Sequence, residues 1–368
     1  MSDRVVVVGG GAAGCAVAYY LSKAGVASTV IERDGVASQA SGFSAGGLNP
    51  LEGAGIPGPL APLAIESFRM HQAMWDELRD ESGVDFQPGP VSIVRIAFDD
   101  SELDGMDETL RVFEAAEGFS ARYLDSAGLH ELEPRLSPDA VGALYTYGNT
   151  ALDSYRYTLA LSMAAQRRGS EFRSGSVSAL KTSGSRVEAV TTESSEIGCD
   201  ALVLAMGPWS AQAEPWLGVR IPVVPLKGEI LRVRLPGRAL EHDFSWGHSS
   251  LYHRSDGLAW IGATEERRGF DVRPSEEARQ SLLAEAVRIM PAIADAELVR
   301  HTACLRPVTP DWLPIIGKAP GWDNIYLATG AGKKGILLSP GIGKAVSDLV
   351  ARGTTTLPVD PFTPDRFA

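Results

Sequence analysis

Cysteine is scarce in this chain, and long apolar segments are missing. Cys15, Cys199 and Cys304 lie far apart, which excludes a disulfide framework or a zinc ribbon and favours a reducing compartment. No apolar stretch approaches the roughly 18–20 residues that a membrane span needs. The short run Val5–Val8 lacks the length and the cleavage site of a signal peptide. We therefore expect a cytoplasmic globular protein without a membrane partner.

Positive charge and clustered histidine are also limited. The 34 Lys and Arg residues are outnumbered by 46 Asp and Glu residues, which gives a formal net charge of −12. Nucleic-acid partners usually require a basic patch, so none is expected. No two of the six histidines lie three or four residues apart, and we expect no metal site. A length of 368 residues predicts about two domains.

The N-terminal residues have a pattern typical of nucleotide-binding proteins. Residues 4–8 form a β-branched run that predicts a buried strand, and a helical pattern follows that ends at Gly25. Between them stands Gly9-x-Gly11-x-x-Gly14. Gly9 permits a tight turn, Gly11 lets the backbone approach a pyrophosphate, and Gly14 lets helix and strand pack closely. The helix N-terminus then offers free N–H groups to phosphates.

A second predicted strand, residues 28–32, ends in the carboxylate of Glu32. Glu32 lies 18 residues beyond Gly14, where an acidic side chain can accept hydrogen bonds from ribose hydroxyls. It would repel a 2′-phosphate, which disfavours NADP. This unit by itself does not distinguish NAD from FAD.

The rest of the chain alternates between helical and strand patterns. Predicted helices cover residues 66–82, 99–117, 154–168, 274–289 and 341–351. Residues 38–62 are rich in Gly, Ala, Ser and Pro, which predicts a loop or short broken helices. Residues 225–235, 250–253 and 258–263 read as strands of a separate, mostly antiparallel sheet.

Three further stretches decide between the cofactors. They are residues 38–48, rich in small side chains; residues 201–210, which end in Gly-Pro-Trp-Ser; and the C-terminal pair 305–317 and 328–340. Together with the glycine triplet they resemble the FAD-dependent D-amino-acid oxidase superfamily, especially its glycine oxidase and sarcosine oxidase branch. The resemblance covers essentially the whole chain.

The resemblance implies an α/β fold, α+β overall. A Rossmann-type FAD-binding domain with a βαβ unit would comprise residues 1–80, 145–218 and 300–368. A substrate-binding domain on a mostly antiparallel sheet would comprise residues 81–144 and 219–299. The oligomeric state is left open.

The resemblance also implies which residues contact FAD. These are Gly9, Gly11, Ala12, Ala13, Gly14, Glu32, Arg33, Ser38, Ser41, Ser44, Ala45, Gly46, Gly47, Leu48, Val177, Ala205, Gly207, Trp209, Arg306, Gly332, Lys333, Lys334, Gly335 and Ile336.

Carried over by position, Arg306 corresponds to the arginine that holds a substrate carboxylate, and Tyr252 to a tyrosine that contacts the same group. Lys333 stands where glycine oxidases tend to have a second arginine, and Lys334 where they have asparagine. The two lysines would supply positive charge near the flavin or a second carboxylate, or be solvated.

Cys304 has two interpretations. It lies seven residues before Asp311, the position at which sarcosine oxidases place a cysteine linked to the flavin as a thioether. The following Leu305-Arg306-Pro307 resembles glycine oxidases, whose flavin is not covalently held, so non-covalent FAD is favoured.

The implied reaction is oxidation of an amine α to a carboxylate, with glycine or an N-substituted glycine as substrate. Hydride transfer from Cα to flavin N5 would give an imine that hydrolyses to glyoxylate and an amine, and O₂ would be reduced to H₂O₂. A D-amino-acid oxidase or dehydrogenase is an alternative. Oxidation of a 2-hydroxy acid is another; it needs a base, for which His301 and His253 are the candidates.

Overall fold

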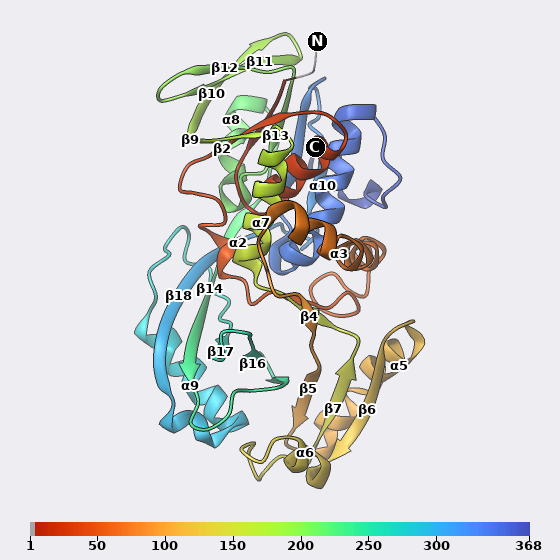
Figure 1. Cartoon of the computed structure of the whole chain (residues 1–368), viewed down its shortest axis with the longest axis vertical. Coiled ribbons are helices and arrows are strands. Elements are labelled where there is room, and N and C mark those ends of the chain that lie inside the picture. The colour runs from red at the N-terminus through yellow and green to blue at the C-terminus, as the bar shows by residue number, and fades with distance from the viewer. Residues whose placement is uncertain (1–3) are drawn as a thin grey trace.

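The computed structural model describes residues 4–368. Their two largest β-sheets have six and eight strands. In Figure 1 the six-stranded sheet and its helices form the upper half, and the eight-stranded sheet forms the lower half. A small three-stranded sheet lies between them, built from β3 (Gly47–Leu48), β8 (Thr150–Ala151) and β4 (Gly89–Pro90). The predicted fold class, a Rossmann-type unit joined to a mostly antiparallel sheet, is confirmed.

The six-stranded sheet is parallel except at one edge. Its order is β19 (Ile315–Lys318), β20 (Ile325–Thr329), β13 (Ala201–Leu204), β1 (Val5–Val8), β2 (Ser28–Glu32) and β9 (Glu171–Ser174), and only β19 runs antiparallel. All four valines of β1 are buried, as expected for the central strand of a sheet that is covered on both faces.

Helices cover one face of this sheet, and a second small sheet covers the other. The helices are α1 (Ala12–Lys23), α3 (Ala61–Ser82), α7 (Ser154–Arg167) and α10 (Gly335–Arg352), which share one apolar core. The small sheet consists of β10 (Val177–Ser183), β11 (Arg186–Thr192) and β12 (Glu196–Gly198), and packs with α8 (Glu214–Leu217) in a second core.

The eight-stranded sheet is built from strands between residues 93 and 308. Its order is β18 (Glu297–Val308), β14 (Val224–Arg234), β17 (Ala259–Gly262), β16 (Ser249–His253), β15 (Asp243–Trp246), β5 (Ile93–Ala97), β7 (Gly142–Tyr147) and β6 (Ser120–Asp125). Helices α6 (Ser126–Leu132) and α9 (Glu276–Ile289) pack on one face. The other face carries Ile230, Tyr252 and Arg306, which line the cleft described below.

Short elements complete the described chain. They are α2 (Ala40–Phe43), α4 (Asp100–Asp104), α5 (Asp107–Ala115) and the 3₁₀ helices η1 (Gly207–Ala213), η2 (Pro291–Asp295), η3 (Gly332–Lys334), η4 (Asp360–Phe362) and η5 (Pro364–Phe367). No helix within residues 4–368 combines the length and the apolar character needed to cross a bilayer.

Two predicted elements need correction. The predicted 99–117 helix is divided into α4 and α5 at Gly105. The last helix, expected from Gly341, begins at Gly335 and continues through Pro340. A Cβ on Gly343 would lie 2.6 Å from the Cβ of Ala16 in α1, so the close approach of α10 to α1 explains why packing overrides the helix-breaking tendency of proline.

The long strand β18 was not predicted from the sequence. It pairs with β14 from Glu297 to Val308, so the predicted domain boundary at residue 300 falls inside a strand of the eight-stranded sheet. The boundary at residue 145 likewise falls inside β7. Divisions after Tyr147 and Val308 would follow the sheets, and the domain assignment itself stays a prediction.

Candidate functional site

A cleft of about 540 Å³ lies between the two large sheets. Val8, Glu32 and Ala205 line it from the carboxyl ends of β1, β2 and β13, and Ile230 and Arg306 line it from the eight-stranded sheet. Carboxyl ends of parallel strands are where open α/β sheets bind ligands. We refer to this cavity as the central cleft.

The turn after β1 can only be formed by glycine. Gly9 has φ +110°, and a Cβ there would lie 2.3 Å from the carbonyl oxygen of Ala205. A Cβ on Gly14 would lie 2.0 Å from the carbonyl oxygen of Gly9. The N-terminus of α1 has no side-chain cap and no acidic residue in its first turn, although the N–H of Ala12 donates to Ser41 Oγ at 2.9 Å. The turn is therefore shaped to receive phosphate groups.

Glu32 and Arg33 line the cleft at the carboxyl end of β2. Glu32 accepts hydrogen bonds from the N–H of Gly10 (2.6 Å) and from the N–H of Asp34 (2.8 Å), which fixes its carboxylate at the end of β2. The guanidinium of Arg33 pairs with Asp34 and lies 4.8 Å from the ring centroid of Trp209. A carboxylate held in this way can accept from ribose hydroxyls with its remaining lone pairs.

Most of the residues predicted to contact a cofactor meet at this cleft. Those that line it are Gly9, Gly11, Ala12, Ala13, Glu32, Arg33, Ser41, Ser44, Ala45, Gly46, Gly47, Leu48, Val177, Ala205, Gly207, Trp209, Arg306, Gly332, Lys333, Lys334, Gly335 and Ile336. Gly14 lies beneath the turn, where it serves helix–strand packing. Ser38 does not line the cleft, and its hydroxyl is buried without a hydrogen-bond partner.

Arg306 reaches the cleft from β18. Its guanidinium lies over Gly228 of β14, where any Cβ would come within 2.3 Å of it. Nη1 donates to the carbonyl oxygen of Thr264 at 2.9 Å, which uses one of the five N–H donors of a guanidinium. Within residues 4–368, no carboxylate forms an ion pair with Arg306. The remaining donors are therefore available to a ligand.

Tyr252, on β16, lines the same cleft. Burial raises the pKa of its hydroxyl, and the positive charge of Arg306 opposes this change. The hydroxyl is therefore protonated at neutral pH and can donate a hydrogen bond.

Asp243 and Arg254 connect the eight-stranded sheet to the small-residue loop, and sequence reasoning did not identify this pair. Arg254 Nη1 lies 3.0 Å from Asp243 Oδ1, and Arg254 Nε donates to the carbonyl oxygen of Ala45. Burial raises the pKa of the Asp243 carboxyl, while Arg254 opposes the shift. No local motif could reveal the contact, because its members come from three separate segments.

The two lysines of η3 have different surroundings. Lys334 Nζ donates to the carbonyl oxygens of Asn49 (2.9 Å) and Glu52, and burial lowers its pKa to about 8. Lys333 Nζ instead forms an ion pair with Glu265, which also lines the cleft. Lys334 therefore holds the loop around residue 50, and Lys333 is neutralised by a neighbour.

Cys304, the candidate for a covalent bond to the flavin, lies on β18. Cys304 is buried, lines the cleft and lies opposite Gly228, and burial raises the pKa of its thiol.

Neither His301 nor His253, the two candidate bases, lines the cleft. Because side chains alternate along a strand, His301 and Arg306 point to opposite faces of β18. Among the described residues, His248 is the one histidine that lines the cleft.

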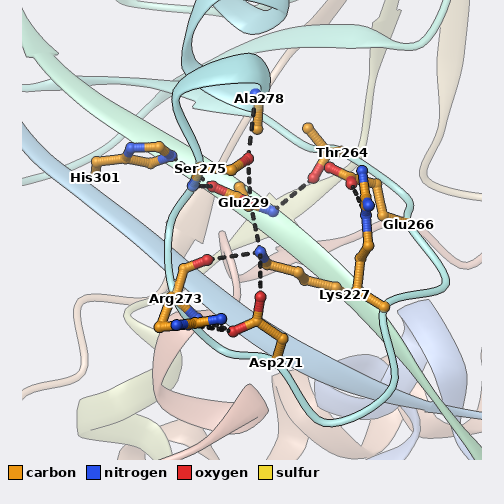
Figure 2. Close-up of polar contacts among 10 residues, drawn as sticks. Lys227, Glu229, Thr264, Glu266, Asp271, Arg273, Ser275, Ala278 and His301 are labelled. Atoms are coloured by element: carbon orange, nitrogen blue, oxygen red, sulfur yellow. Dashed lines mark hydrogen bonds and ion pairs between the residues drawn. The ribbon is translucent and has the colours of Figure 1, made fainter.

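A buried ionic cluster supports the wall of the cleft (Figure 2). Lys227 and Glu229 flank Gly228 on β14, expose 2% and 0% of their side chains, and approach to 2.9 Å. His301 Nε2 lies 2.7 Å from Glu229 Oε2, and both Ser275 N–H and Ser275 Oγ donate to the same carboxylate. Burial alone would raise the pKa of Glu229, but the bonds from Lys227 and Ser275 hold it below its ordinary value.

We expect Lys227→Met to cost about 3–5 kcal/mol of the free energy of unfolding, because it leaves a buried carboxylate without its charge partner. Denaturant unfolding of the purified protein measures this cost. The double variant Lys227→Met/Glu229→Gln should recover much of the loss, since no unpaired charge remains. Lys23→Met is the matched control: its pair with Glu77 is partly exposed and should cost less than about 1 kcal/mol. Equal costs for the two lysines would contradict the prediction.

Comparisons with known proteins agree with this geometry. The family model described as "DAO: FAD dependent oxidoreductase" matches residues 4–349. The glycine oxidase of Geobacillus kaustophilus is 31% identical over 364 residues, which cover 98% of this chain and 96% of that protein. A crystal structure of the glycine oxidase from the same species covers 100% of both chains with a TM-score of 0.93 and 29% identity. An iminodiacetate oxidase from Chelativorans sp. BNC1 has a TM-score of 0.90 at 25% identity, covering 98% of this chain and 99% of that one.

Proposed function

Because this chain belongs to the DAO family of FAD-dependent oxidoreductases, we propose that it is an oxidase of amines α to a carboxylate, acting on glycine or an N-substituted glycine. The observation that carries the proposal is Arg306. Its guanidinium faces the central cleft on the sheet opposite the glycine turn, with no acidic partner among the described residues. The similarity to glycine oxidases and an iminodiacetate oxidase supports the same substrate class.

The residues present fit FAD. The turn at Gly9 and the open N-terminus of α1 would hold the pyrophosphate, and Glu32 the ribose. The loop around Gly46 and the glycine turn at Gly332 would lie along the isoalloxazine. When bound, FAD supplies the two-electron acceptor for a hydride. We propose that it is held non-covalently, since Cys304 is buried and its thiol pKa is raised, which disfavours the reactive thiolate.

The chain's own residues bind and orient the substrate. Arg306 would donate two parallel N–H bonds to the carboxylate, a geometry that fixes both distance and direction. The protonated Tyr252 hydroxyl would donate a third. Leu48, Ile230 and Ala263 add apolar surface to the cleft and would limit the access of water near the reacting carbon. This positioning presents the Cα–H bond to the cofactor.

The proton balance needs no base from the protein when the amine binds unprotonated. Loss of a hydride from Cα leaves a substrate iminium ion, which water hydrolyses to glyoxylate and the free amine. The two electrons pass on to O₂, which is reduced to H₂O₂. Oxidation of a 2-hydroxy acid would need a base for the hydroxyl proton; neither predicted candidate, His301 nor His253, lines the cleft, and His248 is the one described histidine that does.

Anaerobic reduction of the flavin tests the proposal. The visible flavin absorbance of the holoenzyme should bleach with glycine, sarcosine or longer N-alkyl glycines, and readmitted air should restore it with production of H₂O₂. Bleaching by D-amino acids alone would move the assignment to a D-amino-acid oxidase. Bleaching without peroxide on aeration would identify a dehydrogenase, and bleaching by 2-hydroxy acids alone would overturn the amine assignment.

A further inference from the structure

The charges that line the central cleft are mostly neutralised by the protein itself. Arg33 is paired with Asp34, Lys333 is paired with Glu265, and Lys334 donates to two backbone carbonyls. Arg306 also lines the cleft, but among the described residues it forms no ion pair, and no acidic residue is next to it in the chain. Of the cations that line the cleft, it is the one within residues 4–368 that combines this with mostly free N–H donors. Apart from the glycine turn at the N-terminus of α1, the cleft therefore offers one binding position for an anionic group.

Glu265 is placed by a rigid neighbour. The residue before it, Thr264, is bonded through three polar atoms: its Oγ1 accepts from Glu229 N–H at 2.9 Å, its N–H donates to Glu229 O at 3.3 Å, and its carbonyl oxygen accepts from Arg306. Figure 2 shows Thr264 beside the buried Lys227–Glu229 pair. The residue after it, Glu266, pairs through its backbone with Lys227 in both directions at 2.9 Å. The backbone of Glu265 is thus fixed from both sides, and Glu265 lines the cleft.

Lys333 is close to Arg306 through the packing of η3 on β18. A Cβ on Gly332 would lie 3.8 Å from a methyl group of Val308, two residues beyond Arg306 on the same strand. Lys333 Nζ also lies 5.3 Å from the ring centroid of Trp312. Glu265 therefore follows a residue that contacts Arg306, and Lys333 follows a residue that packs against the strand carrying Arg306.

We infer that Glu265 is a specificity-determining residue: by neutralising Lys333 it restricts the cleft to substrates with a single carboxylate. This inference rests on the proposed function and deepens it. A second carboxylate on the nitrogen substituent would have to displace Glu265 from Lys333 and would then lie near an unpaired like charge. An uncharged substituent leaves the pair intact. The natural substrate is accordingly glycine or an N-substituted glycine whose substituent carries no acid.

Two ether ligands that cannot be oxidised as amines test the inference by binding alone. Methoxyacetate has the shape of sarcosine with one carboxylate, and diglycolate has the shape of iminodiacetate with two. Titration of the holoenzyme with each, followed by the change in flavin absorbance, gives two values of Kd. In Glu265→Gln the ratio of the diglycolate Kd to the methoxyacetate Kd should fall about tenfold, the effect of one newly available charge-assisted hydrogen bond.

Two further variants control the measurement. Glu266→Gln removes the adjacent carboxylate, which pairs with Arg268 and does not line the cleft, and it should leave the ratio at the wild-type value. Lys333→Gln added to Glu265→Gln should cancel the tenfold gain, because the released cation is absent.

The outcomes separate the two proposals. If wild type does not bind methoxyacetate, the carboxylate position at Arg306 is wrong and the proposed function is contradicted. If methoxyacetate binds but Glu265→Gln leaves the ratio unchanged, only the role of Glu265 is overturned. A gain that persists without Lys333 would overturn it as well, since the effect would not come from the released cation.

Discussion

Arg306→Met is expected to lower kcat/KM for an N-substituted glycine by about a thousandfold. The variant removes two charge-assisted hydrogen bonds to the substrate carboxylate, each worth about 1.5–3 kcal/mol. The guanidinium is already oriented before substrate arrives, by its bond to the carbonyl oxygen of Thr264 and its contact with the bare backbone at Gly228. Little of the binding free energy is therefore spent on ordering the side chain.

Steady-state peroxide production measures this loss, with the flavin content of each preparation determined alongside. Arg306→Lys should recover part of the activity, since it keeps the charge but loses the fork geometry. Arg300→Met is the matched control on the same strand: Arg300 is exposed and does not line the cleft, so the variant should retain wild-type kcat/KM. A decrease of less than about tenfold in Arg306→Met would remove Arg306 from the role of carboxylate ligand.

Gly14→Ala is expected to yield protein that is purified without FAD and unfolds at a lower temperature. A single added methyl group would lie 2.0 Å from the carbonyl oxygen of Gly9 and 3.3 Å from the Cβ of Ala205. Neither contact can be relieved by a flexible side chain, so α1 and the turn after β1 must separate. Overpacking of this kind typically costs about 1–3 kcal/mol or more, and the displaced turn would no longer fit a pyrophosphate.

The flavin-to-protein absorbance ratio and the Tm of the apoprotein report these two effects separately. Gly89→Ala provides the control for replacement of glycine by alanine, because a Cβ there meets no atom within 4 Å. It should bind FAD as wild type does. If Gly14→Ala retains full FAD with an unchanged Tm, the close contact between helix and strand has been misassigned.

The parts of the site that could be predicted are those encoded by neighbouring residues. The turn from Gly9 to Gly14 is local, and the geometric requirement for glycine is visible in its spacing. Arg306 was identified because a recognisable C-terminal segment surrounds it. The strand that carries it was missed, because residues 297–301 interrupt any simple alternation of polar and apolar side chains.

The unpredicted parts are pairs of charges that come together only in the folded chain. Lys227 and Glu229 are two charged residues around a glycine on a strand, a pattern that usually indicates a solvent-exposed face. Their burial depends on Ser275 and His301, which arrive from separate elements. Glu265 and Lys333 likewise meet across 68 residues of sequence, and no periodicity relates them.

Thr264 and Glu265 are neighbours in the chain but differ in how freely they can be substituted, because Thr264 makes three hydrogen bonds that hold the sheet and Arg306 in place. A substitution at Thr264 would disturb fold stability and substrate orientation together, since its side chain accepts from the backbone of Glu229 and its backbone carbonyl accepts from Arg306. Glu265, one residue further, lines the cleft and forms its ion pair between two partly exposed side chains, so it can change at small cost to folding. New substrate ranges should therefore arise in this lineage, or be selected in the laboratory, through residue 265 while its neighbour is retained.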